Sequence, residues 1–398
     1  MILELENINK LTKNEGFTLS NVTTNFNIFL IASKFQKESK TIFVVLDTLY
    51  EAQQYYDKLI NMLSPEEVLF YPSDELITSE LLVSSIEFKL ERNLTIKTIL
   101  DGNKHIVITN LTGIIRKQMP KEKWIKSSIT FKKNDEIDIK ELENYLINSG
   151  YKREYLVGRV GDFSIRGSII DLFPLNRENP IRLDLFDTEI EKIKEFDINT
   201  QRSIKEIDSI EIIPLNEMFY NDNELDIIKN YINSINDKNE KEEEILKNDL
   251  SNLENRTNMS LLRKYIGLIS NETILDFVDK KSIYFINDKN LNQAYLKTLD
   301  DIYEYNSNID GSVFKNLNYF YDLNEIKNKY KINYLESFKV PYSKEIKVRD
   351  AEKFFGNLDS LFEYLKRSDK RIFICLKSKE RLKLLKEALL EKSINYEM

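Results

Sequence analysis

The stretch that decides the fold of this chain is GDFSIRGSIIDLFPLNRENPIRLDLFDTEIEKIKEFDINTQRS, which spans Gly161–Ser203. It contains two segments of alternating polar and apolar residues, and a polar turn at Asn176–Asn179 joins them. Successive side chains of a β-strand point to opposite faces, so this alternation is typical of a sheet that buries one face. The stretch therefore predicts long strands with antiparallel pairing.

The two faces of these segments differ in composition. One face is apolar and carries Phe163, Ile165, Gly167 and Ile169 from the first segment, with Ile181, Leu183 and Leu185 from the second. If that face packs inward, the outer face carries Arg166, Arg182 and Phe186, a combination typical of interface anchors. An exposed arginine supports little of a core, so Arg182→Ala would leave stability nearly unchanged. The alternative is a half-buried sheet whose arginines face water and whose Phe186 is covered by a loop; residue types alone leave both interpretations open.

The same stretch resembles the UvrB-like N-terminal module of the transcription-repair coupling factors, the Mfd family. The family pattern reads G-(D/E)-F-(A/S)-x-R-G, then I-(L/I)-D-(L/V)-F-P, then P-(Y/I/V)-R-(L/I)-(D/E)-(L/F)-F, and closes with FD-x-x-(T/S)-QRS. Nearly every position is matched in Gly161–Ser203. The resemblance continues through Asn61–Glu80 and His105–Ile115 and, more weakly, to both ends of the chain. This signature is shared by UvrB and Mfd.

Length and composition set broad limits. A chain of 398 residues suggests two to four domains, and 41% hydrophobic with 31% charged residues is ordinary for a soluble protein. No apolar run approaches the roughly 18 residues that span a bilayer, and MILELENINK has no secretory pattern. The single cysteine, Cys375 in RIFICL, excludes an internal disulfide and is expected to be a buried core residue. We expect a cytoplasmic protein with no membrane partner.

The charge balance bears on the kind of partner. The net charge of −8 argues against a stand-alone DNA-binding surface, because phosphate contacts need clustered lysine and arginine. A protein is therefore a better first partner for this chain than a nucleic acid.

The pattern along the chain predicts an α/β fold with a parallel sheet. FTLSNV, TIFVVLD, VLFYP and KHIVITN read as strands that alternate with helices over residues 1–120. Residues 121–214 read as an inserted α+β domain with a helix over Asp138–Ser149. SIYFIND and the region around Leu317–Tyr321 read as further strands, and the charged segment Asn221–Ser251 reads as one solvated helix.

The resemblance implies how these parts are grouped. Residues 1–120 plus 215–343 would form one discontinuous domain, a degenerate phosphate-loop NTPase or helicase-like fold, and residues 121–214 would be its inserted UvrA-binding domain. After a linker, residues 350–398 read as the start of a further small α/β domain, with strands at RIFICL and INYEM. We expect the chain to be a fragment of a longer protein.

The phosphate-binding loop of UvrB has no counterpart here. That loop, G-x-x-x-x-G-K-(S/T), needs glycines for its backbone and a lysine for the phosphates. The equivalent turn, Asn21–Asn27, has neither, and Lys34 follows about two helical turns too late. Val22 and Phe26 would crowd a phosphate. The segment YPSDELITSE is also too short for the aromatic hairpin of UvrB, and both departures favour Mfd.

No other catalytic constellation occurs. The one histidine, His105, is expected to be a loop residue, and no pair of metal ligands can be formed with it. Asp171 and Asp184 occupy strand positions where carboxylates can pair with nearby arginines. We predict no catalytic residue, cofactor or metal in this chain. The resemblance assigns ATP, Mg²⁺ and the DNA translocase to a C-terminal part of the intact family proteins.

The resemblance also implies a function. Intact members bind stalled RNA polymerase, move along duplex DNA through their C-terminal domains, and recruit UvrA to begin nucleotide excision repair. The UvrB-like module performs the recruitment, through the positions of Arg166, Arg182 and Phe186, and the C-terminal domain covers this surface at rest. One alternative is a degenerate UvrB-like DNA-binding protein that acts without UvrA. Another, an active ATPase, needs the missing phosphate loop.

Overall fold

The computed structural model describes residues 12–74, 86–236, 238–308, 317–318, 320–354, 356–369, 372, 374, 376 and 378–397. The chain divides into two compact units, Met1–Val348 and Arg349–Met398. No helix in these ranges is long and apolar enough to cross a membrane.

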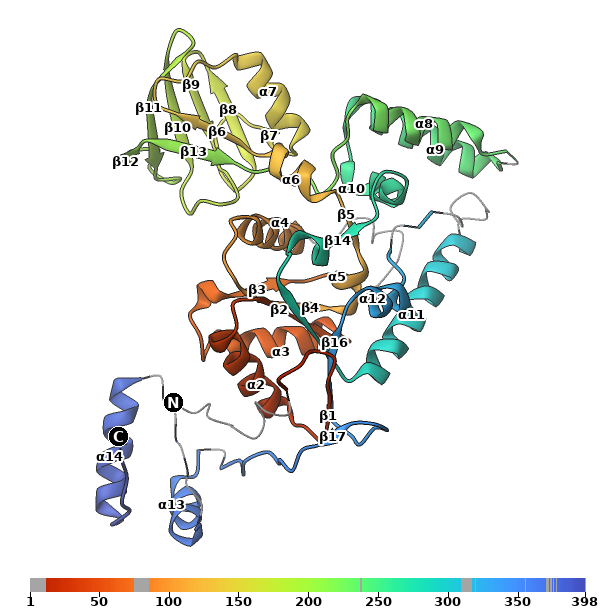
Figure 1. Ribbon diagram of the computed structural model, residues 1–398. Coiled ribbons are helices and arrows are strands. Elements are labelled where there is room, and N and C mark those ends of the chain that lie inside the picture. The colour runs from red at the N-terminus through yellow and green to blue at the C-terminus, as the bar shows by residue number, and fades with distance from the viewer. Residues whose placement is uncertain are drawn as a thin grey trace. The chain divides into compact units, whose positions relative to one another are not determined.

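A seven-stranded parallel sheet forms the centre of the larger unit (Figure 1). Its strands lie in the order β17-β1-β16-β15-β2-β4-β3, and every pairing is parallel. They are β1 (Thr18–Ser20), β2 (Thr41–Leu46), β3 (Val68–Tyr71), β4 (Ile106–Asn110), β15 (Lys281–Ile286), β16 (Ile332–Glu336) and β17 (Lys344–Glu345). The α/β fold predicted from the alternating strands and helices is therefore confirmed.

Helices cover both faces of this sheet. On β2, Ile42 and Val44 enter one hydrophobic cluster while Phe43 and Val45 enter the other, which explains the continuous apolar run of this strand. Figure 1 shows α2 (Thr24–Lys37) and α3 (Leu49–Leu59) on one face, and α4 (Ile86–Leu100) and α5 (Leu111–Ile115) on the other. The second cluster also includes residues of α11 (Asp288–Asn308) and α12 (Leu323–Lys329).

The segment between α5 and α8 (Asp222–Ser234) forms a separate sheet. Its six strands lie in the order β12-β11-β10-β9-β8-β7, antiparallel except for β7 and β8. They are β7 (Lys152–Arg153), β8 (Asp162–Arg166), β9 (Ile169–Leu172), β10 (Ile181–Phe186), β11 (Glu189–Phe196) and β12 (Ser203–Ile207). The inner face packs on α7 (Ile139–Asn148) and on the pair β6 (Ile129–Lys132) and β13 (Ser209–Ile212), and α6 (Lys121–Ser127) leads into this region.

The first alternating segment is not one strand. The chain reverses at Gly167, whose φ of +60° is open to glycine at little cost, and Arg166 pairs directly with Ile169 across the hairpin. The prediction that Ile169 shares a face with Phe163 is therefore wrong. When small residues occupy a tight turn, the alternation of polar and apolar residues continues across it, so the sequence pattern does not reveal the turn.

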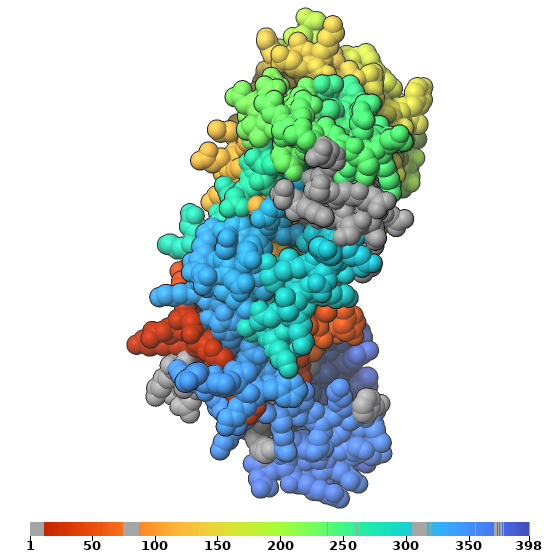
Figure 2. Space-filling view, turned by 90° about the vertical axis from the view of Figure 1, so that its right-hand side faces the viewer, coloured from red at the N-terminus to blue at the C-terminus, as the bar shows by residue number. Residues whose placement is uncertain are grey.

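The charged segment after Tyr220 forms two helices. The prediction of a single helix over Asn221–Ser251 is wrong, because α8 ends at Ser234 and α9 (Glu240–Asn255) begins anew. Asn221 and Asn239 each cap a helix in a capping box. Each helix also buries residues in the core of the sheet domain, among them Ile228 and Leu246, so the pair is only partly solvated. Figure 2 shows α8 and α9, in green, at the surface of the larger unit.

The strands formed by the later part of the sheet domain differ from the strand predicted around Leu317–Tyr321. Among residues 317–318 and 320–321 the strand pairing is a single bridge, between Phe320 and Arg116, so the predicted buried strand there is wrong. The missing sheet strand is β16, a segment not singled out by its sequence. Two short strands, β5 (Lys117–Gln118) and β14 (Glu272–Thr273), pair with each other, and α10 (Met259–Leu262) precedes β14.

The smaller unit contains α13 (Leu358–Arg367) and α14 (Lys379–Glu391). Residues 394–397 form no strand, so the strand expected at INYEM is wrong. The strand expected at RIFICL includes Cys375 and other residues outside the described part of the chain, and it stays a prediction.

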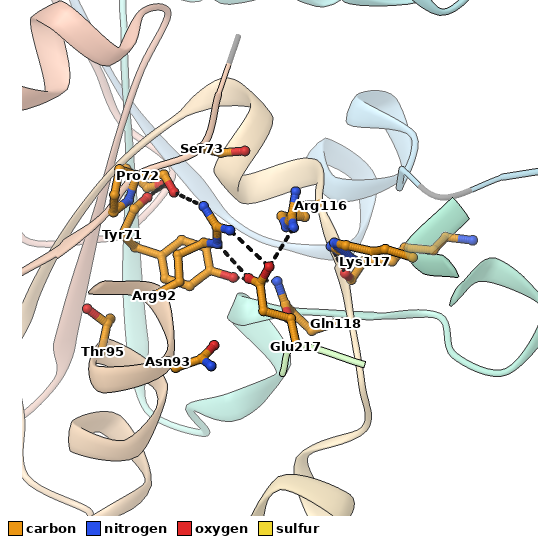
Figure 3. Close-up of polar contacts among 12 residues, drawn as sticks. Tyr71, Pro72, Ser73, Arg92, Asn93, Thr95, Arg116, Lys117, Gln118 and Glu217 are labelled. Atoms are coloured by element: carbon orange, nitrogen blue, oxygen red, sulfur yellow. Dashed lines mark hydrogen bonds and ion pairs between the residues drawn. The ribbon is translucent and has the colours of Figure 1, made fainter. Parts of the chain in front are cut away.

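A buried ion cluster joins the chain that leaves the inserted region to the sheet domain (Figure 3). Glu217 accepts from Nε and Nη2 of Arg92 at 2.6 and 2.9 Å, and from Nη2 of Arg116 at 2.8 Å. Arg92 also donates to the carbonyl of Pro72 at 2.8 Å. Burial would raise the pKa of Glu217, but Arg116 and Arg92 lower it well below its usual range. The carboxylate is thus held charged inside the protein by two guanidiniums.

A candidate protein-docking face on the inserted sheet

The inserted sheet has one buried and one open face, as alternation predicts for β10. Ile181, Leu183 and Leu185 are buried against the inner cluster. Arg182 and Asp184 are half-buried on the opposite face, and Phe186 is 75% exposed. Among the described residues no loop covers the Phe186 ring at this exposure, so the alternative in which Phe186 is shielded is wrong.

Asp171 is the centre of the outer face. It lies on β9, is buried, and forms ion pairs with both Arg166 and Arg182. Arg182 donates from Nε to Oδ1 at 2.6 Å and from Nη2 to Oδ2 at 2.9 Å, a bidentate pair. The strands β8 and β10 are not neighbours, because β9 lies between them. That intervening strand supplies the carboxylate that both arginines share.

Arg182 is held more firmly than an exposed arginine. Its guanidinium lies over the ring of Phe196, 4.7 Å from the centroid, and its side chain is 18% exposed. The hydrogen bonds to Asp171 raise the pKa of Arg182. Arg166, at 36% side-chain exposure, presents more of its fork to solvent. Arg182 therefore stabilises the outer face through its contacts with Asp171 and Phe196. We now expect Arg182→Ala to lower the stability of the protein, contrary to the expectation from the sequence.

Phe186 lies further along β10, beyond a second ion pair. Asp184 accepts from Lys194 Nζ at 2.6 Å, so this acid pairs with a lysine rather than with an arginine. The structure thus brings Arg166 and Arg182 together at Asp171 and puts Phe186 on the same face, four residues from Arg182.

Sequence reasoning missed two exposed residues near this face. Tyr155 and Leu156 lie in the loop between β7 and β8 and are 82% and 47% exposed. Strand periodicity could not have found them, because the residues of a loop have no regular face.

The turn that replaces the phosphate loop is short and closed. Residues 21–23 connect β1 to α2, and the side chain of Thr23 caps the helix by accepting from Phe26 N at 3.3 Å. Val22 and Phe26 are buried in the cluster on that face of the sheet, and Lys34 Nζ donates to the carbonyl of Thr12 at 2.7 Å. The cap and the apolar side chains occupy the position where phosphate would meet the helix N-terminus.

The described residues include no group of three or more His, Cys, Asp and Glu side chains that could hold a metal ion. His105 precedes β4, its Nδ1 lies 3.2 Å from the carbonyl of Glu66, and burial lowers its pKa. This histidine is packed against the backbone, as expected for a loop residue before a buried strand.

The comparisons with a protein-family model and with known proteins agree with each other. Residues 129–218 match the UvrB interaction domain family. A transcription-repair-coupling factor of Bacillus subtilis (strain 168) is 39% identical over 180 residues, 45% of this chain and 15% of its own length. One of Staphylococcus aureus (strain Mu50) is 33% identical over 207 residues, 52% of this chain and 18% of its own. One of Staphylococcus epidermidis is 25% identical over 405 residues, 96% of this chain and 35% of its own.

The chain therefore spans between about a seventh and about a third of the length of these relatives. The matched UvrB interaction domain contains the whole of the outer face described above, from Tyr155 to Phe186.

Proposed function

We infer that this chain, which is similar to the N-terminal UvrB-like region of the transcription-repair-coupling factors, recruits UvrA in transcription-coupled nucleotide excision repair. The observation that carries this proposal is the outer face of the inserted sheet, where Phe186 is 75% exposed on the same face as two arginines that share Asp171. This face lies within the residues that match the UvrB interaction domain.

The chemistry of the face fits a protein partner. Arg166 offers guanidinium donors to a carboxylate, and Asp171 holds that guanidinium in one orientation, so little side-chain entropy is lost on binding. Phe186 adds apolar area that a partner can desolvate. The net charge of −8 disfavours the alternative in which the chain binds DNA without UvrA.

The activity of the whole protein is proposed to lie outside this chain. ATP, Mg²⁺, the translocase and the contacts to RNA polymerase and duplex DNA would belong to the rest of the longer relatives, and a C-terminal domain of that part would cover the outer face at rest. The capped turn between β1 and α2 supports the absence of an ATPase here.

A titration of purified UvrA with the full chain tests the proposal. Phe186→Ala should weaken binding by about thirtyfold, corresponding to a hot-spot loss of about 2 kcal/mol. The matched control is Phe338→Ala, since Phe338 is 82% exposed on the loop between β16 and β17, away from the inserted sheet. Unchanged affinity of Phe186→Ala, or salt-sensitive DNA binding without UvrA binding, would contradict the proposal.

A further inference from the structure

We propose that the loop between β7 and β8 is a second part of the docking face, with Tyr155 and Leu156 as its apolar anchors for UvrA. This inference rests on the proposed function and deepens it, because it adds contacts that the arginines and Phe186 do not provide.

The loop is fixed, although two of its side chains are exposed. Tyr155 and Leu156 are 82% and 47% exposed, but the next residue, Val157, is buried and packs with Phe173 and Phe196. Of these three consecutive apolar side chains, only Val157 is buried, and those of Tyr155 and Leu156 are exposed to solvent. Exposed apolar neighbours on a fixed backbone are typical of interaction sites.

Hydrogen bonds hold the loop backbone in this conformation. The hydroxyl of Ser164 donates to the carbonyl of Tyr155 at 3.0 Å. The carboxylate of Asp162 accepts from the backbone N–H groups of Gly158 and Arg159 at 3.1 and 3.0 Å. Both ends of the exposed pair are therefore tied to β8. A partner that binds here has little loop entropy to remove, which favours affinity.

The loop lies over the same face as the arginines. Ser164, which holds the Tyr155 carbonyl, is opposite Asp171 in the strand register, and it shares a face with Arg166 two residues later. Val157 packs against Phe196, and Arg182 lies over that same ring. The loop therefore borders the Asp171 centre on one side.

Phe186 borders that centre on the other side. It lies four residues beyond Arg182 on β10, which corresponds to about 13 Å at roughly 3.4 Å per residue. The face then has an apolar anchor at each end and guanidiniums between them. A partner surface that fits would present an acidic side chain between two apolar contacts.

The size of a stable interface supports this extension. A specific interface covers roughly 800 Å² on each partner and involves about 20 to 30 residues, far more than three side chains supply. The loop continues the face with apolar area, and the largely exposed Arg159 adds a cation at its rim. The opposite direction, beyond Phe186, leads to the polar turn at Asp187 and Thr188.

The test compares UvrA binding by the full chain and by a double variant, Tyr155→Ser with Leu156→Ser. We expect a loss of at least about tenfold in affinity, because two anchors of the interface are truncated. The melting temperature should stay unchanged, since both side chains are exposed and the hydrogen bond that Tyr155 makes with Ser164 uses its backbone carbonyl, which the substitution keeps. Tyr342→Ser is the matched control, because Tyr342 is fully exposed on the loop before β17.

Comparison with Phe186→Ala distinguishes failure of the loop inference from failure of the proposed function. If Phe186→Ala weakens UvrA binding while the double variant binds like the unmodified chain, the loop is not part of the interface and the inference is overturned. If both variants bind normally, the proposed function itself fails. An equal loss in Tyr342→Ser would also overturn the inference, because the effect would then not be specific to this loop.

Discussion

At the residue scale, the outer face depends on one carboxylate. Asp171 is 1% exposed and forms ion pairs with two guanidiniums, so it stabilises the outer face from within the protein. The side chain of Arg166 remains accessible to a binding partner. The sequence predicted which side chains of β10 point outward, since alternation alone determines this. The sequence also indicated that Asp171 could pair with an arginine, but not that Arg166 and Arg182 share it, because a local pattern does not show which strand lies between two others.

Replacing Asp171 should affect both stability and binding. Asp171→Asn removes the charge that pairs with Arg166 and Arg182, and we expect a loss of about 1–3 kcal/mol in the free energy of unfolding, measured by urea denaturation. UvrA affinity should fall as well, because Arg166 loses its fixed orientation.

Asp184→Asn is the control for that measurement. Its pair with Lys194 is more exposed than the pairs of Asp171, so its loss should cost less than about 1 kcal/mol. Equal destabilisation by the two substitutions would show that Asp171 has no special part in holding the face.

At the element scale, the connections between strands and helices were predicted least reliably. The missing glycines and lysine of the β1–α2 turn were visible in the sequence, and the structure adds the Thr23 cap and the burial of Val22. The hairpin at Gly167 and the break between α8 and α9 were missed. In both cases the periodic pattern of polar and apolar residues continued across a turn. The only sign of the turn in the sequence was a glycine or a capping asparagine.

The closed turn predicts that the chain does not bind ATP. Isothermal titration with Mg-ATP should give no heat of binding, and Mg-ATP should not raise the melting temperature, because a ligand that binds only the folded state would do so. A dissociation constant in the micromolar range would show that the Thr23-capped turn opens, and it would revive the ATPase interpretation.

At the scale of the whole molecule, a buried charge cluster holds distant segments together. Arg92 and Glu217 are 125 positions apart in sequence, yet they form a bidentate pair. The strands of the parallel sheet before residue 120 could be predicted from their apolar runs. The cluster could not, because its members come from α4, from the end of α5 and from the chain that follows the inserted sheet, and only the folded structure brings them together.

The cluster predicts a pH dependence of stability. The pKa of Glu217 in the folded protein is well below the usual 4.5, so its stabilising effect is complete above that value and is lost as the pH falls through the lowered pKa. Glu217→Gln should cost about 3–5 kcal/mol at neutral pH, because it leaves buried guanidiniums uncompensated. Glu217→Gln should also make the free energy of unfolding decrease less steeply as the pH falls below 4.5. Urea unfolding from pH 2 to 7 would measure both, and an unchanged acid dependence would contradict the assignment.

The strand order of the parallel sheet has a consequence for synthesis on the ribosome. β15 lies between β2 and β16, but it is made after the complete inserted sheet, and β16 follows later still. The inserted sheet can therefore fold while the first sheet is unfinished, with the edge of β2 lacking its neighbour. The newborn chain would carry an unpaired apolar strand from the synthesis of β2 until β15 is made. This is the period in which we expect it to depend most on chaperones.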